Sequence, residues 1–234
     1  MELPTDDKMI VEVLLQAYRL GAFPMADPDT GALNFYTSNP RGVFLLESDN
    51  PFHTPRSVRR AIRSRGFEIR ADTDFENVIR ACAAPRRDDD KSWIDERIID
   101  WFTALHRAGH AHSVEAWRPD TETGEPHLVG GVYGVVLGAA FFGESMFHRP
   151  RPRLPSGERH PLDGTDASKV CLTRLVEHLT RQGFTLFDAQ LVNPHIARYG
   201  CVNIDHEEYM SLLTEAVDLP VEWGEFQVQP QPDC

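Results

Sequence analysis

The chain has 234 residues, of which 41% are hydrophobic and 9% aromatic, enough to bury one core and carry a small additional domain. No stretch approaches the roughly 20 apolar residues of a membrane span. The first residues, MELPTDDKM, lack the cationic and apolar regions of a secretory signal. We therefore expect a cytoplasmic protein with no membrane partner. The formal net charge of −12 opposes binding to long polyanions, except through a local basic patch.

The first half of the chain predicts a helix followed by mixed elements. Apolar residues at helical spacing over 9–20, MIVEVLLQAYRL, end at Gly21, which is typical of a C-capped helix. Turns and short strands follow, so we expect residues 1–50 to form a small N-terminal α/β domain and residues 51–234 the main domain. The next patterns predict a helix at 56–65, a strand at 67–72 and helices at 75–83 and 94–109.

The second half predicts an antiparallel meander and a long loop before the last elements. Three strands separated by tight turns are expected at 110–118, 127–136 and 139–147. The Pro-rich segment at 148–167 is a loop too long for idle packing. A helix at 168–183, a strand at 185–192 and helical segments at 193–200 and 206–217 follow. This order of elements indicates an α+β fold.

Cysteine and histidine spacing predicts no metal site. The cysteines are scattered, contain no CxxC pair and are interpreted as reduced thiols. They are Cys82, Cys171, Cys201 and Cys234. His110 and His112 place two rings on one side of a strand, but no third ligand stands at a useful spacing. The histidine pair is therefore interpreted as a partly solvated strand edge.

The stretch RSVRRAIRSR at 56–65 carries five arginines and no acid. On a helix Arg56, Arg60 and Arg63 share one face, and Arg59 borders it. Guanidinium groups spaced in this way, about 6 Å apart along the axis, suit the phosphates of a nucleic-acid strand. The alternative is a solvated surface balanced by acids elsewhere, and composition alone favours it, because charge runs usually mean only exposure.

Motifs for nucleotide cofactors and nucleophilic serines are absent. The chain contains neither a GxxxxGK phosphate loop nor GxGxxG after a strand. The glycines of GGVYGVVLG fall in a predicted hairpin, where they mark close packing or turns. Ser145 lies within a predicted strand and not in a GxSxG elbow. We therefore expect no cofactor.

Two carboxylates fall in apolar strands. In TLFDAQL alternate side chains face the same way, so Asp188 and Gln190 are predicted to project together, roughly 7 Å apart. Glu144 lies among aromatic residues in FFGESMF. Such acids can simply bridge to an arginine or the backbone, but two of them in one apolar sheet favour chemistry. An acid and an amide without metal, cofactor or nucleophile suit acyl transfer from an activated ester to an amine.

Sequence blocks from about Leu14 to Leu213, in order, resemble the leucyl/phenylalanyl-tRNA-protein transferase family. The blocks are LLQAYRLGAFPM, NPRGVF, FHTPRSVRR, SWID, GHAHSVEAW, LVGGVYGV, FFGESMF, ASK and FDAQLVNPH. Members of that family move Leu or Phe from aminoacyl-tRNA onto the N-terminal Arg or Lys of proteins, marking them for N-end rule degradation. The resemblance implies an acetyltransferase-like (GNAT) mixed sheet flanked by helices, behind a small N-terminal domain.

The resemblance also implies the residues of an active site. Asp188 and Gln190 match a catalytic pair, in which the Asp polarises the Gln or acts directly to deprotonate the attacking amine. Glu144 matches the acid of the family's GESM block and is the third catalytic residue. Acids at the acceptor site would attract a cationic Arg or Lys side chain.

The transferred Leu, Phe or Met side chain would enter an apolar pocket. The matching residues are Val132, Phe141, Met146, Leu172, Leu175, Leu179 and Phe187. On periodicity alone, the stripe of three leucines in this set is first a core stripe. Both interpretations can hold, because a pocket is an incompletely filled core.

For the tRNA, the resemblance implies contacts to the acceptor stem and the 3′ end. Phosphates would be held by Arg56, Arg59, Arg60 and Arg63, while bases of the 3′ end would stack on Trp93, Phe35 and Tyr36. Familiar members carry Trp-Trp where Phe35 and Tyr36 stand, and the loop at 148–167 is longer than its usual counterpart.

Two other functions stay open at this stage. An acyl-CoA-dependent N-acetyltransferase would share the fold, but HPLDGTDASK, before the helix at 168–183, offers only one glycine for a pyrophosphate turn. A non-catalytic RNA or peptide binder could retain the same scaffold, although the presence of Asp188, Gln190 and Glu144 argues against it.

Overall fold

The computed structural model describes residues 6–47, 52–85 and 91–228. Its main feature is a seven-stranded sheet in the order β4-β5-β6-β7-β8-β3-β9. These strands are β3 (Arg41–Leu45), β4 (Glu68–Ala71), β5 (Ala111–Pro119), β6 (Pro126–Leu137), β7 (Ala140–His148), β8 (Leu186–Gln190) and β9 (Val202–Ile204). Neighbours are antiparallel except β7 and β8, which are parallel, so the sheet is mixed.

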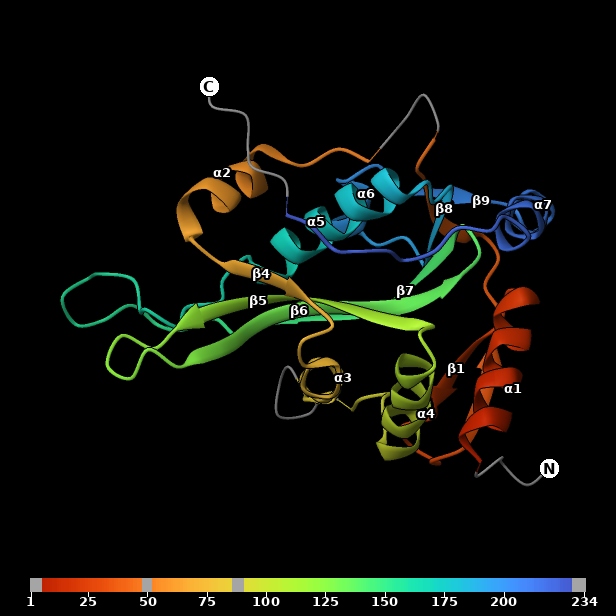
Figure 1. Ribbon diagram of the computed structural model, residues 1–234, viewed down its shortest axis with the longest axis horizontal. Helices are drawn as coiled ribbons and strands as arrows, with labels where there is room; N and C mark the ends of the chain where they lie inside the picture. The colour runs from red at the N-terminus through yellow and green to blue at the C-terminus, as the bar shows by residue number, and fades with distance from the viewer. Residues whose placement is uncertain (1–5, 48–51, 86–90, 229–234) are drawn as a thin grey trace.

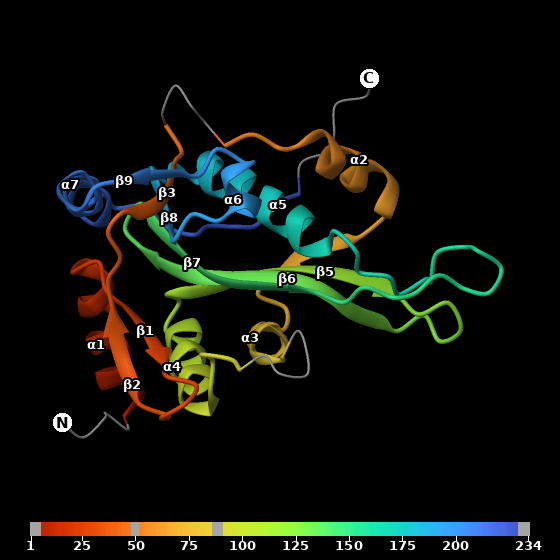
Figure 2. The same cartoon turned by 180° about the vertical axis from the view of Figure 1, so that it is seen from behind.

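Helices cover both faces of this sheet (Figure 1). The helices are α1 (Asp7–Arg19), α2 (Arg56–Arg65), α3 (Phe75–Ala83), α4 (Glu96–Arg107), α5 (Ala167–Gln182), α6 (Pro194–Ala197) and α7 (His206–Val217). α2, α5 and α6 lie on one side of the sheet, and α1, α3 and α4 lie on the other (Figure 2). A hairpin of β1 (Phe23–Ala26) and β2 (Leu33–Tyr36) packs with α1 and α4. The protein is thus a mixed α+β protein, as its element order predicts.

The two layers bury separate cores, which explains the continuous apolar runs of the central strands. Val132 and Val136 of β6 pack in the core under α5, whereas Tyr133 and Val135 pack in the core against α3 and α4. A strand covered on both faces needs apolar side chains at successive positions. The predicted meander of β5, β6 and β7 is confirmed.

The sequence predicted most elements but missed how two strands join the sheet. The basic helix spans Arg56–Arg65 as predicted. The three-residue strand β9 was not predicted, and β3, which was expected in the N-terminal domain, lies between β8 and β9. The division of the chain at residue 50 stays a prediction.

The glycines of β6 permit close packing, as predicted, and Gly143 of β7 does the same. A Cβ atom on Gly134 would lie 2.2 Å from the carbonyl oxygen of Phe142. A Cβ atom on Gly143 would lie 2.4 Å from the ring of Phe187. These contacts are too short for any larger residue, so the glycines set the distance between neighbouring elements.

Within the described ranges, no helix has the length and apolarity needed to cross a membrane. The same residues contain no group of three or more His, Cys, Asp or Glu that could hold a metal ion. The Nδ1 atom of His112 instead lies 2.8 Å from Oδ2 of Asp72, and the His112 ring stacks on the ring of Trp223. Cys171 and Cys201 are buried free thiols, Cys82 is also buried, and Cys234 lies outside the described residues.

Candidate active site

The parallel strands β7 and β8 diverge after a short paired stretch. Residues 140–142 pair with residues 186–188, but β7 continues to His148 and β8 to Gln190. The space between the diverging ends forms part of a cavity of about 1240 Å³. α5 and α6 line the cavity from one layer, and β1 and the end of α3 line it from the other. The cavity is therefore formed by the whole fold and not by one loop.

Glu144 occupies a β-bulge in β7 where the strands diverge. The pairing register with β6 shifts by one residue at this position, which leaves Glu144 as the extra residue. Glu144 lines the cavity, and the Tyr18 hydroxyl donates a 2.7 Å hydrogen bond to its Oε1. Burial and the negative charge of Asp188 raise the pKa of Glu144 to about 8, against opposing effects of Tyr18 and Arg41. Such an acid can exchange a proton near neutral pH.

A second bulge, at Ala189 in β8, separates Asp188 from Gln190. Asp188 lies opposite Val43 of β3, and Gln190 lies opposite Gly42. Because Gly42 and Val43 are adjacent in β3, they face opposite sides of the sheet, and so do their partners. The predicted projection of Asp188 and Gln190 to one side is therefore wrong, since the bulge interrupts the alternation. Gln190 lines the cavity, whereas Asp188 is fully buried beneath it.

Four donors hold the Asp188 carboxylate. Arg41 donates from Nε to Oδ1 at 2.9 Å and from Nη2 to Oδ2 at 2.6 Å. The Tyr209 hydroxyl and the backbone N–H of Gln190 donate at 2.7 Å and 2.9 Å. These donors use the acceptor positions of the carboxylate. Asp188 thus forms the bridge to an arginine that the sequence left open as an alternative.

Gln190 adopts an unusual backbone conformation at the cavity wall. Its φ of 55° lies in the left-handed region, which non-glycine residues rarely adopt. The backbone N–H of Gln190 donates to Asp188, and the backbone carbonyl of Gln190 accepts a 3.0 Å hydrogen bond from the Ser38 hydroxyl. Both backbone groups of Gln190 are therefore held in place. The buried side-chain Nε2 has no hydrogen-bond partner among the described residues. An acceptor on a bound molecule would satisfy this donor.

Only some of the residues predicted for the apolar pocket line the cavity. Val132, Met146, Leu172 and Phe187 line the cavity. The other predicted members are buried core residues and do not line it: Phe141, Leu175 and Leu179. The helical spacing of Leu175 and Leu179 indicated a core stripe, and that interpretation holds for these two residues. Apolar lining residues that the sequence did not predict include Phe23, Met25, Phe44 and Ile196. They lie on distant segments, so no local pattern could have found them.

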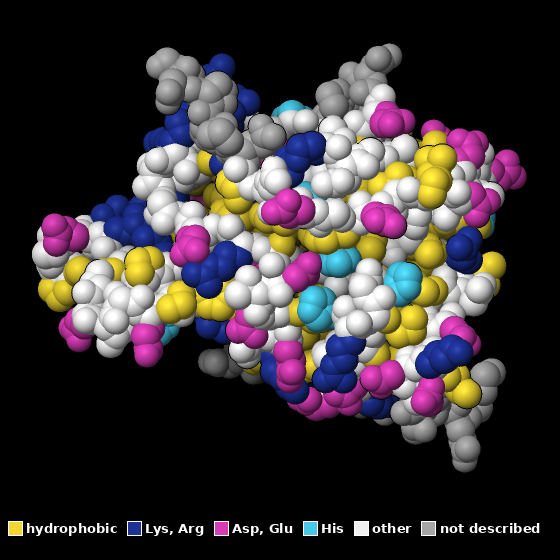
Figure 3. All heavy atoms as spheres, viewed as in Figure 1, with side chains coloured by type: hydrophobic (Ala, Val, Ile, Leu, Met, Phe, Trp, Pro, Cys, Tyr) yellow, Lys and Arg dark blue, Asp and Glu magenta, His cyan; other side chains and the backbone are white. Residues whose placement is uncertain are grey.

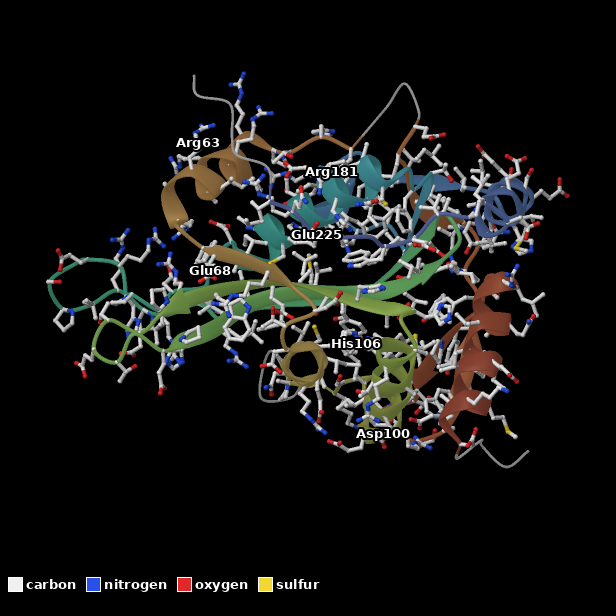
Figure 4. The ribbon with its side chains drawn as sticks, in the orientation of Figure 1. Arg63, Glu68, Asp100, His106, Arg181 and Glu225 are labelled. Atoms are coloured by element: carbon white, nitrogen blue, oxygen red, sulfur yellow. The ribbon has the colours of Figure 1, made fainter. Side chains whose placement is uncertain are left out.

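The predicted tRNA-binding residues lie in three places. Trp93 lines the cavity from the layer of α3 and α4. Phe35 and Tyr36 are exposed on β2 and do not line the cavity; Phe35 stacks on Trp101 at 6.2 Å. The four predicted arginines of α2 are exposed and form no ion pair with any described residue. In Figure 4, Arg63 points outward from α2.

The rim of the cavity carries cations that the sequence did not predict. Arg149 and Arg151 line it from the loop after β7, and Lys169 lines it from the first turn of α5. Glu144 is the acidic side chain among the lining residues. The Arg-Pro alternation of RPRPR at 149–153 was the available signal. The prolines of this segment predict a loop but do not indicate that its arginines reach the cavity.

Comparisons with known proteins agree on one family. The model for leucyl/phenylalanyl-tRNA protein transferase matches residues 45–214, and the model for the N-terminal domain of that protein matches residues 10–39. The leucyl/phenylalanyl-tRNA–protein transferase of Rubrobacter xylanophilus is 47% identical over 212 residues, which are 91% of this chain and 97% of that protein. Its counterpart in Akkermansia muciniphila is 41% identical over 213 residues, covering 91% and 98%.

Among solved structures, that of FemX gives a TM-score of 0.49 at 11% identity, covering 83% of this chain and 66% of that one. This likeness is too distant to bear on activity. The matches to the family models and to the relatives define an aminoacyltransferase. The chain belongs to the leucyl/phenylalanyl-tRNA protein transferase family.

Proposed function

We propose that this protein transfers Leu or Phe, with Met as a further donor residue, from aminoacyl-tRNA to the N-terminal Arg or Lys of acceptor proteins. The new peptide bond would mark the acceptor for N-end rule degradation in the cytoplasm. The observation that carries the proposal is the cavity between the diverging strands, which joins an apolar wall to Glu144 and the free amide N–H of Gln190.

The apolar wall suits the transferred side chain. Val132, Met146, Leu172 and Phe187 offer no hydrogen-bonding group to it. Such a wall rejects a charged side chain, because an unpaired charge is costly to bury. It separates Leu from Met weakly, since a methylene is worth only about 1 to 3 kcal/mol.

The reaction moves two protons from the N-terminal ammonium. The first passes to a base, which frees the amine to attack. The amine nitrogen then bonds to the ester carbonyl carbon, the bond to the ribose oxygen breaks, and the second proton passes to that oxygen, which leaves as the tRNA hydroxyl. An α-amino group has a pKa of about 8, and the pKa of Glu144 is raised to about 8. Proton transfer between them is close to balanced in free energy, so we assign Glu144 as the general base.

Asp188 and Gln190 have different roles in this proposal. Asp188 cannot readily take the proton, because Arg41 and Tyr209 already occupy its oxygens. It holds the backbone of Gln190 in the left-handed turn. The Gln190 amide then donates to the carbonyl oxygen of the ester, where negative charge develops.

The remaining assignments concern the tRNA and the fold. Exposed Arg56, Arg59, Arg60 and Arg63 would bind acceptor-stem phosphates, and Trp93 would stack on the 3′ end inside the cavity. Phe35 and Tyr36 could contact the 3′ end only outside the cavity. We also propose that the sheet is acetyltransferase-like, in which case the diverging β7 and β8 would hold the acyl donor.

Preference for a basic acceptor would rest on the cavity acid. Glu144 attracts a cation when it is ionised, while Arg149, Arg151 and Lys169 at the rim repel one. The acceptor should therefore approach from the layer of β1 and α3, and not over the basic rim.

A transfer assay with labelled Leu-tRNA tests the function. Peptides beginning with Arg, Lys, Asp or Glu serve as matched acceptors, and product is expected with the first two alone. Leu172→Gln, which keeps the helix and adds a polar group to the wall, should lower transfer by about 10-fold or more, whereas Arg107→Gln on α4 should not.

Two results would replace the proposal. Tight acetyl-CoA binding by calorimetry, without transfer from Leu-tRNA, would support an N-acetyltransferase. Binding of aminoacyl-tRNA with no labelled product would support a non-catalytic binder.

A further inference from the structure

A basic loop projects beyond the end of the sheet (Figures 1 and 2). The first residues of this loop line the cavity. We call residues 149–160, RPRPRLPSGERH, the arginine arm. It contains Arg149, Arg151, Arg153 and Arg159, and a single acid, Glu158. All four arginines are exposed. Prolines between the first three restrict the backbone, so this basic segment is stiffer than an ordinary loop.

The base of the arginine arm is anchored to the body of the protein. Asp163 is buried and accepts from the Arg65 guanidinium at 3.3 Å and from the Arg151 backbone N–H at 3.1 Å. Arg65, the last residue of α2, also contacts Asp166 at 2.8 Å. The arm is therefore tied to both α2 and the start of α5. Charge repulsion among its arginines cannot simply swing it away.

Three of the four arginines have no carboxylate partner in the described parts of the chain. Arg159 pairs with Asp163. Arg149 donates to the Leu128 carbonyl at 3.1 Å, and Arg153 donates to the Gly157 carbonyl at 2.7 Å. No ion pair joins Arg149, Arg151 or Arg153 to a described acid. In a chain of net charge −12, such unpaired cations side by side indicate an external anion.

The arm continues the basic surface that begins at the cavity. Arg149 and Arg151 line the cavity with Lys169, and Arg153 follows them outward. Lys and Arg side chains gather over α2 and the adjoining part of the arm in Figure 3. In Figures 1 and 2 the arm lies between the basic helix α2 and the β5–β6 turn at 120–125, which is acidic. A polyanion leaving the cavity would pass between two cationic elements.

We propose that the arginine arm is a second phosphate-binding surface, which holds the double-stranded stem of the donor RNA while its 3′ end occupies the cavity. This inference rests on the proposed function. A duplex carries closely spaced phosphates that multiple guanidinium groups can contact together. The cationic acceptor peptide is the wrong partner for this surface, because like charges repel.

The test distinguishes binding of the RNA stem from binding of the 3′ end. Arg151→Gln/Arg153→Gln is compared with wild type for binding of full-length Leu-tRNA over a series of salt concentrations. It is also compared for transfer from a leucyl-trinucleotide, which lacks the stem. The expected result is about 10-fold weaker binding of Leu-tRNA at low salt, a salt slope reduced by about 2, and a much smaller loss with the trinucleotide, because only Arg151 of the two lines the cavity.

Matched variants control for nonspecific charge effects and folding. Arg19→Gln/Arg107→Gln removes two exposed arginines from α1 and α4 and should leave the slope unchanged. Arg151→Lys/Arg153→Lys should restore most of the binding. Equal slopes for wild type and the glutamine variant would overturn the arm proposal, as would equal losses with the trinucleotide or a change confined to KM for the acceptor peptide. Failure of the wild type to bind Leu-tRNA at all would instead refute the proposed function.

Discussion

At the scale of single residues, the raised pKa of Glu144 makes activity depend on pH in a definite direction. Below a pH of about 8 the side chain is mostly protonated and cannot accept a proton, so transfer should increase as the pH rises through this value. Glu144→Gln should lower kcat by about 100-fold or more, with a smaller effect on Leu-tRNA binding. Single-turnover rates from pH 6 to 9 would measure this.

The amine of the acceptor titrates in the same range, and a control separates the two groups. A peptide whose α-amine has a lower pKa should move the amine's titration and leave that of Glu144 in place. A pH profile that follows the acceptor alone would remove Glu144 from the role of base.

The pair of Asp188 and Arg41 determines stability as well as geometry. Asp188→Asn leaves the buried Arg41 guanidinium without its counter-ion, and should lower the free energy of unfolding by about 3 kcal/mol or more. Tyr209→Phe removes one hydrogen bond to the same carboxylate and should cost about 2 kcal/mol. Urea unfolding of the two variants measures both. Equal losses would mean that the ion pair contributes no more than this single charge-assisted hydrogen bond.

At the scale of elements, α2 should act in binding and not in folding. Its arginines are exposed and unpaired with described acids, so Arg60→Ala/Arg63→Ala should leave the melting temperature within a few degrees of wild type. The same change should lower Leu-tRNA affinity and reduce its salt slope by about 2. Ser57→Ala/Ser64→Ala alters exposed positions of the same helix without changing charge. Unchanged affinity in the arginine variant would support the alternative interpretation, in which α2 is only a solvated surface.

The contact between β7 and β8 should set the size of the pocket. A Cβ atom on Gly143 would lie 2.4 Å from the Phe187 ring, which lines the cavity. Gly143→Ala should therefore displace that ring into the cavity and lower kcat/KM for Phe more than for Leu. Gly134→Ala, which meets Phe141 and Phe142 away from the cavity, should reduce stability without changing this ratio. An unchanged ratio in Gly143→Ala would show that Phe187 moves elsewhere.

Local sequence patterns predicted the elements because most of them repeat their apolar side chains at a short, regular spacing. The helix at 56–65 and the meander of β5 to β7 follow from side-chain spacing alone. The site did not follow in the same way. The bulges at Glu144 and Ala189 depend on pairing with β6 and β3, so strict alternation gave the wrong side for Asp188. Arg41 lies 147 residues from Asp188 in the chain, and no local pattern could pair them.

At the scale of the whole molecule, the C-terminal segment after α7 packs on the core under α5, where Trp223 contacts the buried His178. The ring of Trp223 stacks on His112 at 4.3 Å, and its carbonyl accepts a 2.7 Å hydrogen bond from Nε2 of His178. The Arg181 guanidinium donates to Nδ1 at 3.3 Å. This geometry requires neutral His178, protonated at Nε2. Burial lowers its pKa to about 4, with Arg181 and His112 acting in the same direction, while the hydrogen bond to the Trp223 carbonyl and the charge of Asp72 oppose them.

This arrangement predicts a loss of stability in mild acid. The folded state binds the proton of His178 more weakly than the unfolded state, so its contribution is complete above pH 6.5 and is lost as the pH falls toward 4. About 2 kcal/mol should be lost between pH 6.5 and 4.5. Glu144 acts in the opposite direction in this range, because its raised pKa favours the folded state as the pH falls. The His178 effect must therefore be measured as a difference: His178→Gln keeps a donor for the Trp223 carbonyl but cannot titrate. Chemical unfolding at both pH values should give a smaller acid loss in the variant, and the same loss in both proteins would exclude His178 as its source.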